Sequence, residues 1–114
     1  MGKLTAVSCE TSKPNKDRDR LIGDGDGLFL RIRPDGTKAW VVVYEFKEAG
    51  RKYAIGSYDP NGAPGASIEQ WLRHRRLSLT QARAIAGEWK AARSAGHDPV
   101  AEWEAELVKD LVYP

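Results

Sequence analysis

Several residue types that mark particular protein classes are scarce in this 114-residue chain. It has one cysteine, Cys9, and two histidines, so an internal disulfide is excluded and no structural zinc site is expected, because neither histidine has a partner at metal-ligand spacing. No apolar run approaches the roughly 18 to 20 residues of a membrane span, and the first residues lack the apolar block of a signal peptide. These absences predict a cytoplasmic protein without a metal or another cofactor.

The chain also lacks a recognisable catalytic motif. The glycine-rich residues 23–27 precede an extended segment, whereas a dinucleotide-binding loop follows a strand and opens a helix. The two aspartates of this run begin like a calcium loop, but Leu28 occupies the third ligand position. No nucleophile, base and orienting group share a familiar spacing, so we predict that this chain is not itself an enzyme.

The strongest local signal is the run from Gly23 to Phe46, in which two alternating segments flank a Pro-Asp-Gly turn. A type I turn with Gly36 in the left-handed position makes a three-residue loop and places Leu30 opposite Trp40. Side chains alternate along a strand, so the large apolar residues gather on one face. The opposite face then carries Phe29, Arg31, Arg33, Val41 and Val43.

A third strand is predicted for residues 51–58, which also alternate. A loop with an even number of residues, either 49–50 or 47–50, puts Tyr53 on the apolar face and Lys52 beside the arginines. The result is an antiparallel meander of three strands with the second strand in the middle.

The amino-terminal residues 1–20 are polar and are interrupted by Pro14, which predicts an arm over the sheet. At most a short helical turn is expected near Thr5. Leu21 and Ile22 leave room for a short strand before the glycine-rich bend.

Capping boxes mark two helices after the strands. Ser67 opens a short amphipathic helix that ends near residue 76, and Ser78 opens the main helix, which runs to about residue 95. We expect the apolar stripe of the main helix, with Trp89, to cover the apolar face of the sheet. The predicted fold is therefore α+β: a three-stranded antiparallel meander packed on one long C-terminal helix, with a short inserted helix and a helical linker.

Charge is unevenly distributed. Residues 1–97 hold 17 Lys and Arg against 11 Asp and Glu, a net charge of +6, whereas residues 98–114 have a net charge of −4. The basic excess favours a polyanionic partner, although part of it is ordinary solvated surface.

Three groups of short motifs occur in a distinctive order. They are Asp26-Gly27-Leu28 with Leu30-Arg31-Ile32, then Gly36-Thr37-Lys38-Ala39-Trp40, then Leu79 with Ala82-Arg83 ahead of Gly96, Asp98 and Pro99. This arrangement resembles the N-terminal arm-DNA-binding domain of phage- and genomic-island-type integrases, which are tyrosine site-specific recombinases. The resemblance implies a non-catalytic DNA-binding domain over residues 1–97, with an insertion at 60–77. It also implies that residues 98–114 begin an acidic helical linker to core-binding and catalytic domains.

The resemblance implies that the sheet enters the major groove of double-stranded DNA at arm-type sites, in support of DNA integration and recombination. Other recombinase protomers are further candidate partners. Arginine can bond guanine bidentately and small apolar groups can meet a thymine methyl, while basic residues at turns and edges suit phosphates. The predicted DNA-binding residues are Phe29, Arg31, Arg33, Thr37, Lys38, Val41, Val43, Arg51, Lys52, Arg73, Arg75 and Arg76.

Two alternatives stay open at this stage. The middle strand carries Val43 and Glu45 where the family often has basic residues, so the exposed face could instead dock a protein, or its arginines could be ordinary solvated residues. Likewise, the arginines of residues 73–76 could reach phosphates or simply solubilise a helix that covers the edge of the core. Binding that weakens steeply with salt would indicate DNA.

Overall fold

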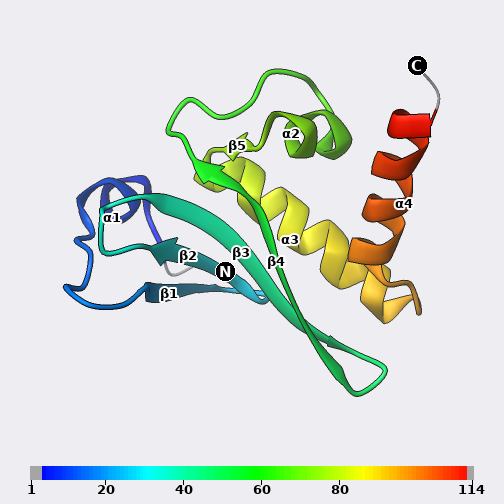
Figure 1. The fold of residues 1–114 in the computed structure, drawn as a ribbon, viewed down its shortest axis with the longest axis horizontal. Coiled ribbons are helices and arrows are strands. Elements are labelled where there is room, and N and C mark those ends of the chain that lie inside the picture. Colours follow the sequence, from blue (N-terminus) through cyan, green and yellow to red (C-terminus); the bar gives the residue numbers. More distant parts are fainter. Residues whose placement is uncertain (1–3, 113–114) are drawn as a thin grey trace.

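The computed structural model describes residues 4–112, in which five strands and four helices are found (Figure 1). The strands are β1 (Arg20–Gly25), β2 (Leu28–Ile32), β3 (Lys38–Phe46), β4 (Ala49–Tyr58) and β5 (Arg76–Leu77). The helices are α1 (Ala6–Thr11), α2 (Ile68–His74), α3 (Leu79–Ser94) and α4 (Pro99–Val112). The strands form one sheet in sequence order, antiparallel from β1 to β4, with β5 parallel to β4.

The α+β class is confirmed, and β2, β3 and β4 form an antiparallel meander with β3 in the middle, but the predicted number of strands is wrong because the sheet has two further strands. At one edge, the glycine-rich bend closes a hairpin that pairs β1 with β2. At the other edge, Ser57 donates its backbone N–H to the Arg75 carbonyl oxygen at 2.8 Å, and Asp59 bonds Leu77 in the same way at 3.0 Å. The long helix is also not C-terminal, since α4 follows α3.

The register of the central hairpin is confirmed. Gly36 adopts a φ of +91°, and the Arg33 N–H donates to the Thr37 carbonyl oxygen at 2.9 Å, which closes the predicted three-residue loop. Leu30 consequently lies opposite Trp40.

The next turn differs from both predicted loops, because the chain reverses at Lys47 and Glu48, whose φ values are +51° and +65°. The number of loop residues is nevertheless even, so the predicted parity holds. Tyr53 lies opposite Val42, and Lys52 lies opposite Val43.

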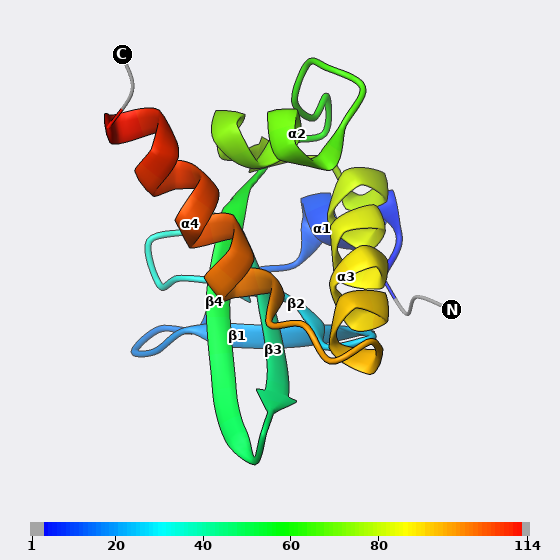
Figure 2. The ribbon, with the colours of Figure 1, turned by 90° about the vertical axis from the view of Figure 1, so that its right-hand side faces the viewer.

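The core lies on the face of the sheet that α3 covers, which we call the inner face. Trp40 is at its centre, fully buried, and donates its indole N–H to the Leu77 carbonyl oxygen at 2.9 Å. Figure 2 shows α3 and α4 on the same side of the strands. Each of the four helices contributes a buried side chain to this core: Cys9, Leu72, Trp89 and Trp103. The first turns of the predicted linker therefore pack against the domain.

The amino-terminal arm forms a helix, α1, in place of a single turn. Thr5 caps it in a capping box with Ser8. None of the helices in the described part of the chain is both long and apolar enough to cross a membrane.

Candidate nucleic-acid interface

The opposite side of the sheet, which we call the outer face, carries five of the side chains that the sequence predicts to bind DNA: Phe29, Arg31, Val41, Val43 and Lys52. Two rows of paired residues define it: Phe29 beside Val41, and Val43 beside Lys52. Because the helices contribute their buried side chains to the core on the inner face, the outer face keeps solvent-accessible positions. Its members are Leu21, Phe29, Arg31, Ala39, Val41, Val43, Glu45, Lys52 and Ala54.

Arg31 lies across the middle of this face. Its cross-strand neighbours are Leu21 on β1 and Ala39 on β3, and its side chain is half-buried. The Nε–H is buried and has no hydrogen-bond acceptor within the described residues. A buried donor without an acceptor costs about 1 to 3 kcal/mol, so this N–H does not stabilise the fold. Arg33, at the β2–β3 turn with Thr37, is exposed.

The apolar members of the outer face differ in accessibility. Val43 is 38% exposed, whereas Val41 is fully buried and is flanked by Phe29 and Ala54. The Phe29 ring leans over Gly23 on β1, where an added Cβ would lie 3.3 Å from a ring carbon. Val43 and Phe29 therefore offer apolar surface, whereas Val41 is enclosed between its neighbours on the two flanking strands.

Lys38 and Arg51 do not belong to the outer face. Lys38 pairs with Ile32, whose side chain is in the core, and its ammonium donates to the carbonyl oxygens of Cys9 at 2.7 Å and Glu10 at 2.8 Å. These acceptors belong to the last turn of α1, where a cation also complements the helix dipole. Lys38 is thus a capping residue in this structure.

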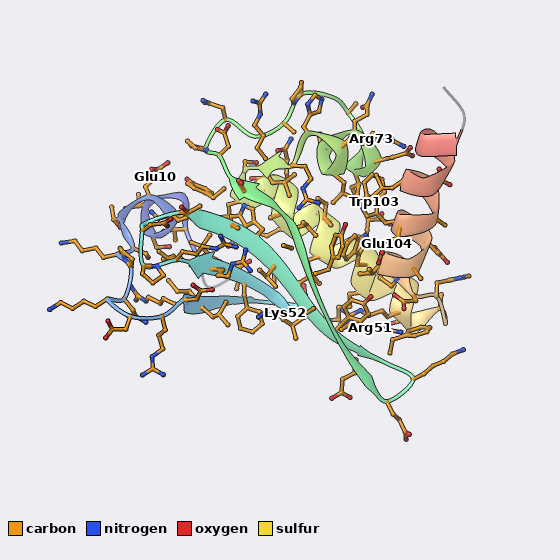
Figure 3. All side chains as sticks on the ribbon, in the orientation of Figure 1. Glu10, Arg51, Lys52, Arg73, Trp103 and Glu104 are labelled. Atoms are coloured by element: carbon orange, nitrogen blue, oxygen red, sulfur yellow. The ribbon has the colours of Figure 1, made fainter. Side chains whose placement is uncertain are left out.

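Arg51 and Lys52 lie on opposite sides of β4, because successive residues of a strand alternate. Arg51 Nε is 3.5 Å from Asp98 Oδ2, and Figure 3 shows Arg51 on the side of α4 and Lys52 on the other side. Both residues are predicted from the sequence to contact phosphates, although alternation alone places them on opposite faces. Of Arg51 and Lys52, only Lys52 lies on the outer face, opposite Val43.

The three arginines of the insertion are held at the far end of the sheet. Arg73 Nη2 lies 2.8 Å from Glu69 Oε1, and its guanidinium carbon is 5.5 Å from the centre of the Trp103 ring (Figure 3). Arg75 ends α2 with a φ of +60°. Arg76 Nε is 4.0 Å from Asp59 Oδ2. Leu72 of the insertion is buried in the core, so the insertion covers its edge, and contact of these arginines with phosphates stays a prediction.

Comparison with known proteins identifies the family. The family described as "Arm DNA-binding domain" matches residues 4–106. The chain belongs to this family. The integrase of Shigella phage Sf6 and the prophage integrase IntS of Escherichia coli K12 are each 28% identical to it over 76 residues. The aligned region is 67% of this chain and 20% of each relative, so the chain spans about a fifth of the length of these integrases.

Two ion pairs between the β1–β2 turn and α3 of the arm DNA-binding domain were not predicted from the sequence. Asp24, almost fully buried, bonds Arg83 of α3, and Asp26 bonds Lys90 at 2.8 Å. The hydrogen bond from Lys90 lowers the pKa of the Asp26 carboxyl. Arg83 and Lys90 are seven residues apart, about two helical turns, and therefore lie on one side of α3. This spacing is the sequence signal that could have indicated the two ion pairs.

The aspartates of the glycine-rich bend therefore anchor the β1–β2 turn to α3. Among residues 4–112, no group of three or more His, Cys, Asp or Glu side chains is arranged to hold a metal ion.

Proposed function

We propose that this arm DNA-binding domain binds double-stranded DNA sequence-specifically at arm-type sites, as the N-terminal part of a phage-type integrase. The outer face of the sheet is the binding surface. One observation carries the proposal: Arg31, Val43 and Lys52 share a sheet face, while the four helices pack their buried side chains on the other. A major groove about 12 Å wide admits strands, so this face can approach base edges directly.

The residues of this face and of the adjoining β2–β3 turn have distinct roles in the proposal. Arg31 and Arg33 contact bases, because a guanidinium group can donate two bonds to the O6 and N7 atoms of guanine. Phe29 and Val43 provide apolar surface for thymine methyl groups. Lys52, farther along β4, neutralises a phosphate and positions the domain without reading sequence.

The two related integrases support a role in DNA integration. We infer that this domain contributes binding and positioning, and that the chemistry of strand exchange belongs to other domains of the parent recombinase. Neighbouring recombinase protomers are further partners in this proposal.

Salt dependence tests the proposal against docking of a protein. Duplexes selected by the domain from a random library would be titrated between about 50 and 200 mM salt. Neutralisation of phosphates makes log K fall linearly with log salt, with a slope of about −0.9 per phosphate contacted. Lys52→Gln should make the slope shallower by about one unit, and Lys38→Gln should leave it unchanged. Absence of duplex binding at the lowest salt, or binding indifferent to salt, would refute DNA as the ligand.

A further inference from the structure

A carboxylate lies on the outer face close to the tip of the β3–β4 hairpin. Glu45 follows Val43 at the next outward position of β3 and lies opposite Gly50 of β4. Its side chain is exposed, and it has no hydrogen bond or ion pair within the described residues. A Cβ added to Gly50 would meet no atom within 4 Å, so the space beside Glu45 is open.

The nearest cation of the outer face does not neutralise this carboxylate. Lys52 lies opposite Val43, which makes it the diagonal neighbour of Glu45, at a typical separation of about 7 to 8 Å. No ion pair joins the two side chains, although both belong to the described residues. On a surface that approaches a polyanion, an unpaired carboxylate is repelled unless it finds a hydrogen-bond donor.

The major groove contains such donors only on some bases. Cytosine presents its N4 amino group alone, and carboxylates accept from it. Adenine presents its N6 amino group beside the N7 acceptor, which repels a carboxylate, and guanine and thymine present the carbonyl oxygens O6 and O4. A carboxylate is therefore attracted by cytosine and repelled by guanine and thymine at the same place.

We propose that Glu45 reads a cytosine, with a carboxylate oxygen accepting a hydrogen bond from the N4 amino group. This inference rests on the proposed function and specifies part of the DNA sequence that the outer face selects. Arg31 pairs with Ala39, six residues before Glu45 on β3, which corresponds to about 20 Å at about 3.3 Å per residue. The two residues therefore address separate base pairs, and the site contains a cytosine in addition to the guanine read by Arg31.

Selection from a randomised duplex library tests this assignment with the whole 114-residue chain. The variants are Glu45→Gln and, as a matched control, Glu48→Gln, which removes the same charge three residues later in the exposed hairpin turn. The wild type should select a motif in which replacing one cytosine weakens binding by roughly fivefold to 100-fold. In Glu45→Gln this one position should lose its preference and accept adenine, because an amide bonds both N6 and N7 of adenine. Glu48→Gln should select the wild-type motif.

Each other outcome overturns the inference in a recognisable way. If Glu45→Gln binds all duplexes more tightly by the same factor and selects an unchanged motif, the carboxylate only repels phosphates. If the wild-type motif depends on Arg31 but not on Glu45, the assignment of cytosine fails and the proposed function stands. If the wild-type chain selects and binds no duplex, both fail. Circular dichroism of each variant verifies that the fold is retained.

Discussion

Arg83 and Asp24 form a bidentate ion pair that joins α3 to the β1–β2 turn. Arg83 Nε lies 2.8 Å from Asp24 Oδ2, and Nη2 lies 2.9 Å from Oδ1. The same carboxylate accepts the Leu4 backbone N–H at 2.7 Å, and Arg83 also donates to the Leu4 carbonyl oxygen. Three segments distant in sequence are therefore fixed to one another behind the outer face.

Replacing Arg83 by Met should lower the free energy of unfolding by about 2 kcal/mol. The substitution keeps the aliphatic packing but leaves the carboxylate of Asp24, which is 3% exposed, without its counter-ion. Breaking a buried pair costs about 3 to 5 kcal/mol, and we expect less because the Arg83 side chain is 39% exposed. Urea unfolding measures the loss. Lys90→Met removes the exposed pair with Asp26 and should leave the midpoint unchanged; equal midpoints for all three proteins would contradict the prediction.

Arg31→Lys should separate base reading from simple charge. Lysine keeps the charge but lacks the planar fork that donates two parallel bonds. We expect the variant to lose about 1 to 3 kcal/mol of binding free energy on a selected duplex and to change little on a scrambled one. Fluorescence titration of both duplexes measures the difference. A similar loss on both would show that Arg31 contacts phosphate.

Lys38→Met should affect stability and not DNA binding. Its ammonium bonds two carbonyl oxygens at the end of α1, so its loss should cost about 1 kcal/mol of unfolding free energy and weaken amide protection in that helix. Hydrogen exchange and urea unfolding measure these effects. Lys52→Met is the reciprocal control, with stability retained and a shallower salt slope. A shallower dependence of DNA affinity on salt in Lys38→Met would show that Lys38 contacts DNA.

The Tyr44 and Asp98 pair should make stability depend on acidic pH. The Tyr44 hydroxyl donates to Asp98 Oδ1 at 2.6 Å, and this bond holds the pKa of the Asp98 carboxyl below its ordinary value. A lowered pKa in the folded state stabilises the fold above the unfolded pKa of about 3.9, and this contribution disappears as pH falls through the folded pKa. The difference in unfolding free energy between wild type and Tyr44→Phe should therefore be constant near neutrality and shrink below about pH 4.

The alkaline side provides a second readout of the same pair. Burial, together with the bond to Asp98, raises the pKa of Tyr44 to about 12. A raised pKa stabilises the fold below the unfolded value of about 10, and this contribution is lost as pH rises toward the folded value. Burial and the hydrogen bond to Glu10 also raise the pKa of Tyr58 to about 12, so ultraviolet absorbance should show one fewer late-titrating tyrosine in Tyr44→Phe than in wild type. A difference in stability that is the same at every pH would contradict both expectations.

Local chemistry was sufficient to predict the central hairpin and the start of the main helix. Gly36 fixes the turn and thereby the register of β2 on β3, and Ser78 with Gln81 forms the predicted capping box of α3. Both features depend on residues that are close together in the sequence, so local sequence patterns are sufficient to predict them.

The missed features depend on contacts between distant segments. β5 has two residues and pairs in parallel with β4, which leaves no periodic signal in the sequence. The role of Lys38 is set by where α1 lies, and a basic residue beside a turn looks the same whether it binds a helix end or a phosphate. The burial of Val41 likewise follows from its cross-strand neighbours, which alternation alone does not reveal.

Backbone amide shifts on titration with a selected duplex test most directly whether the outer face binds DNA. We expect the largest changes at Phe29, Arg31, Val43 and Lys52, and little change at the amide of Trp89 in α3 and at other inner-face positions. Shift changes centred on α2, α3 and α4, with the outer face unperturbed, would contradict this expectation.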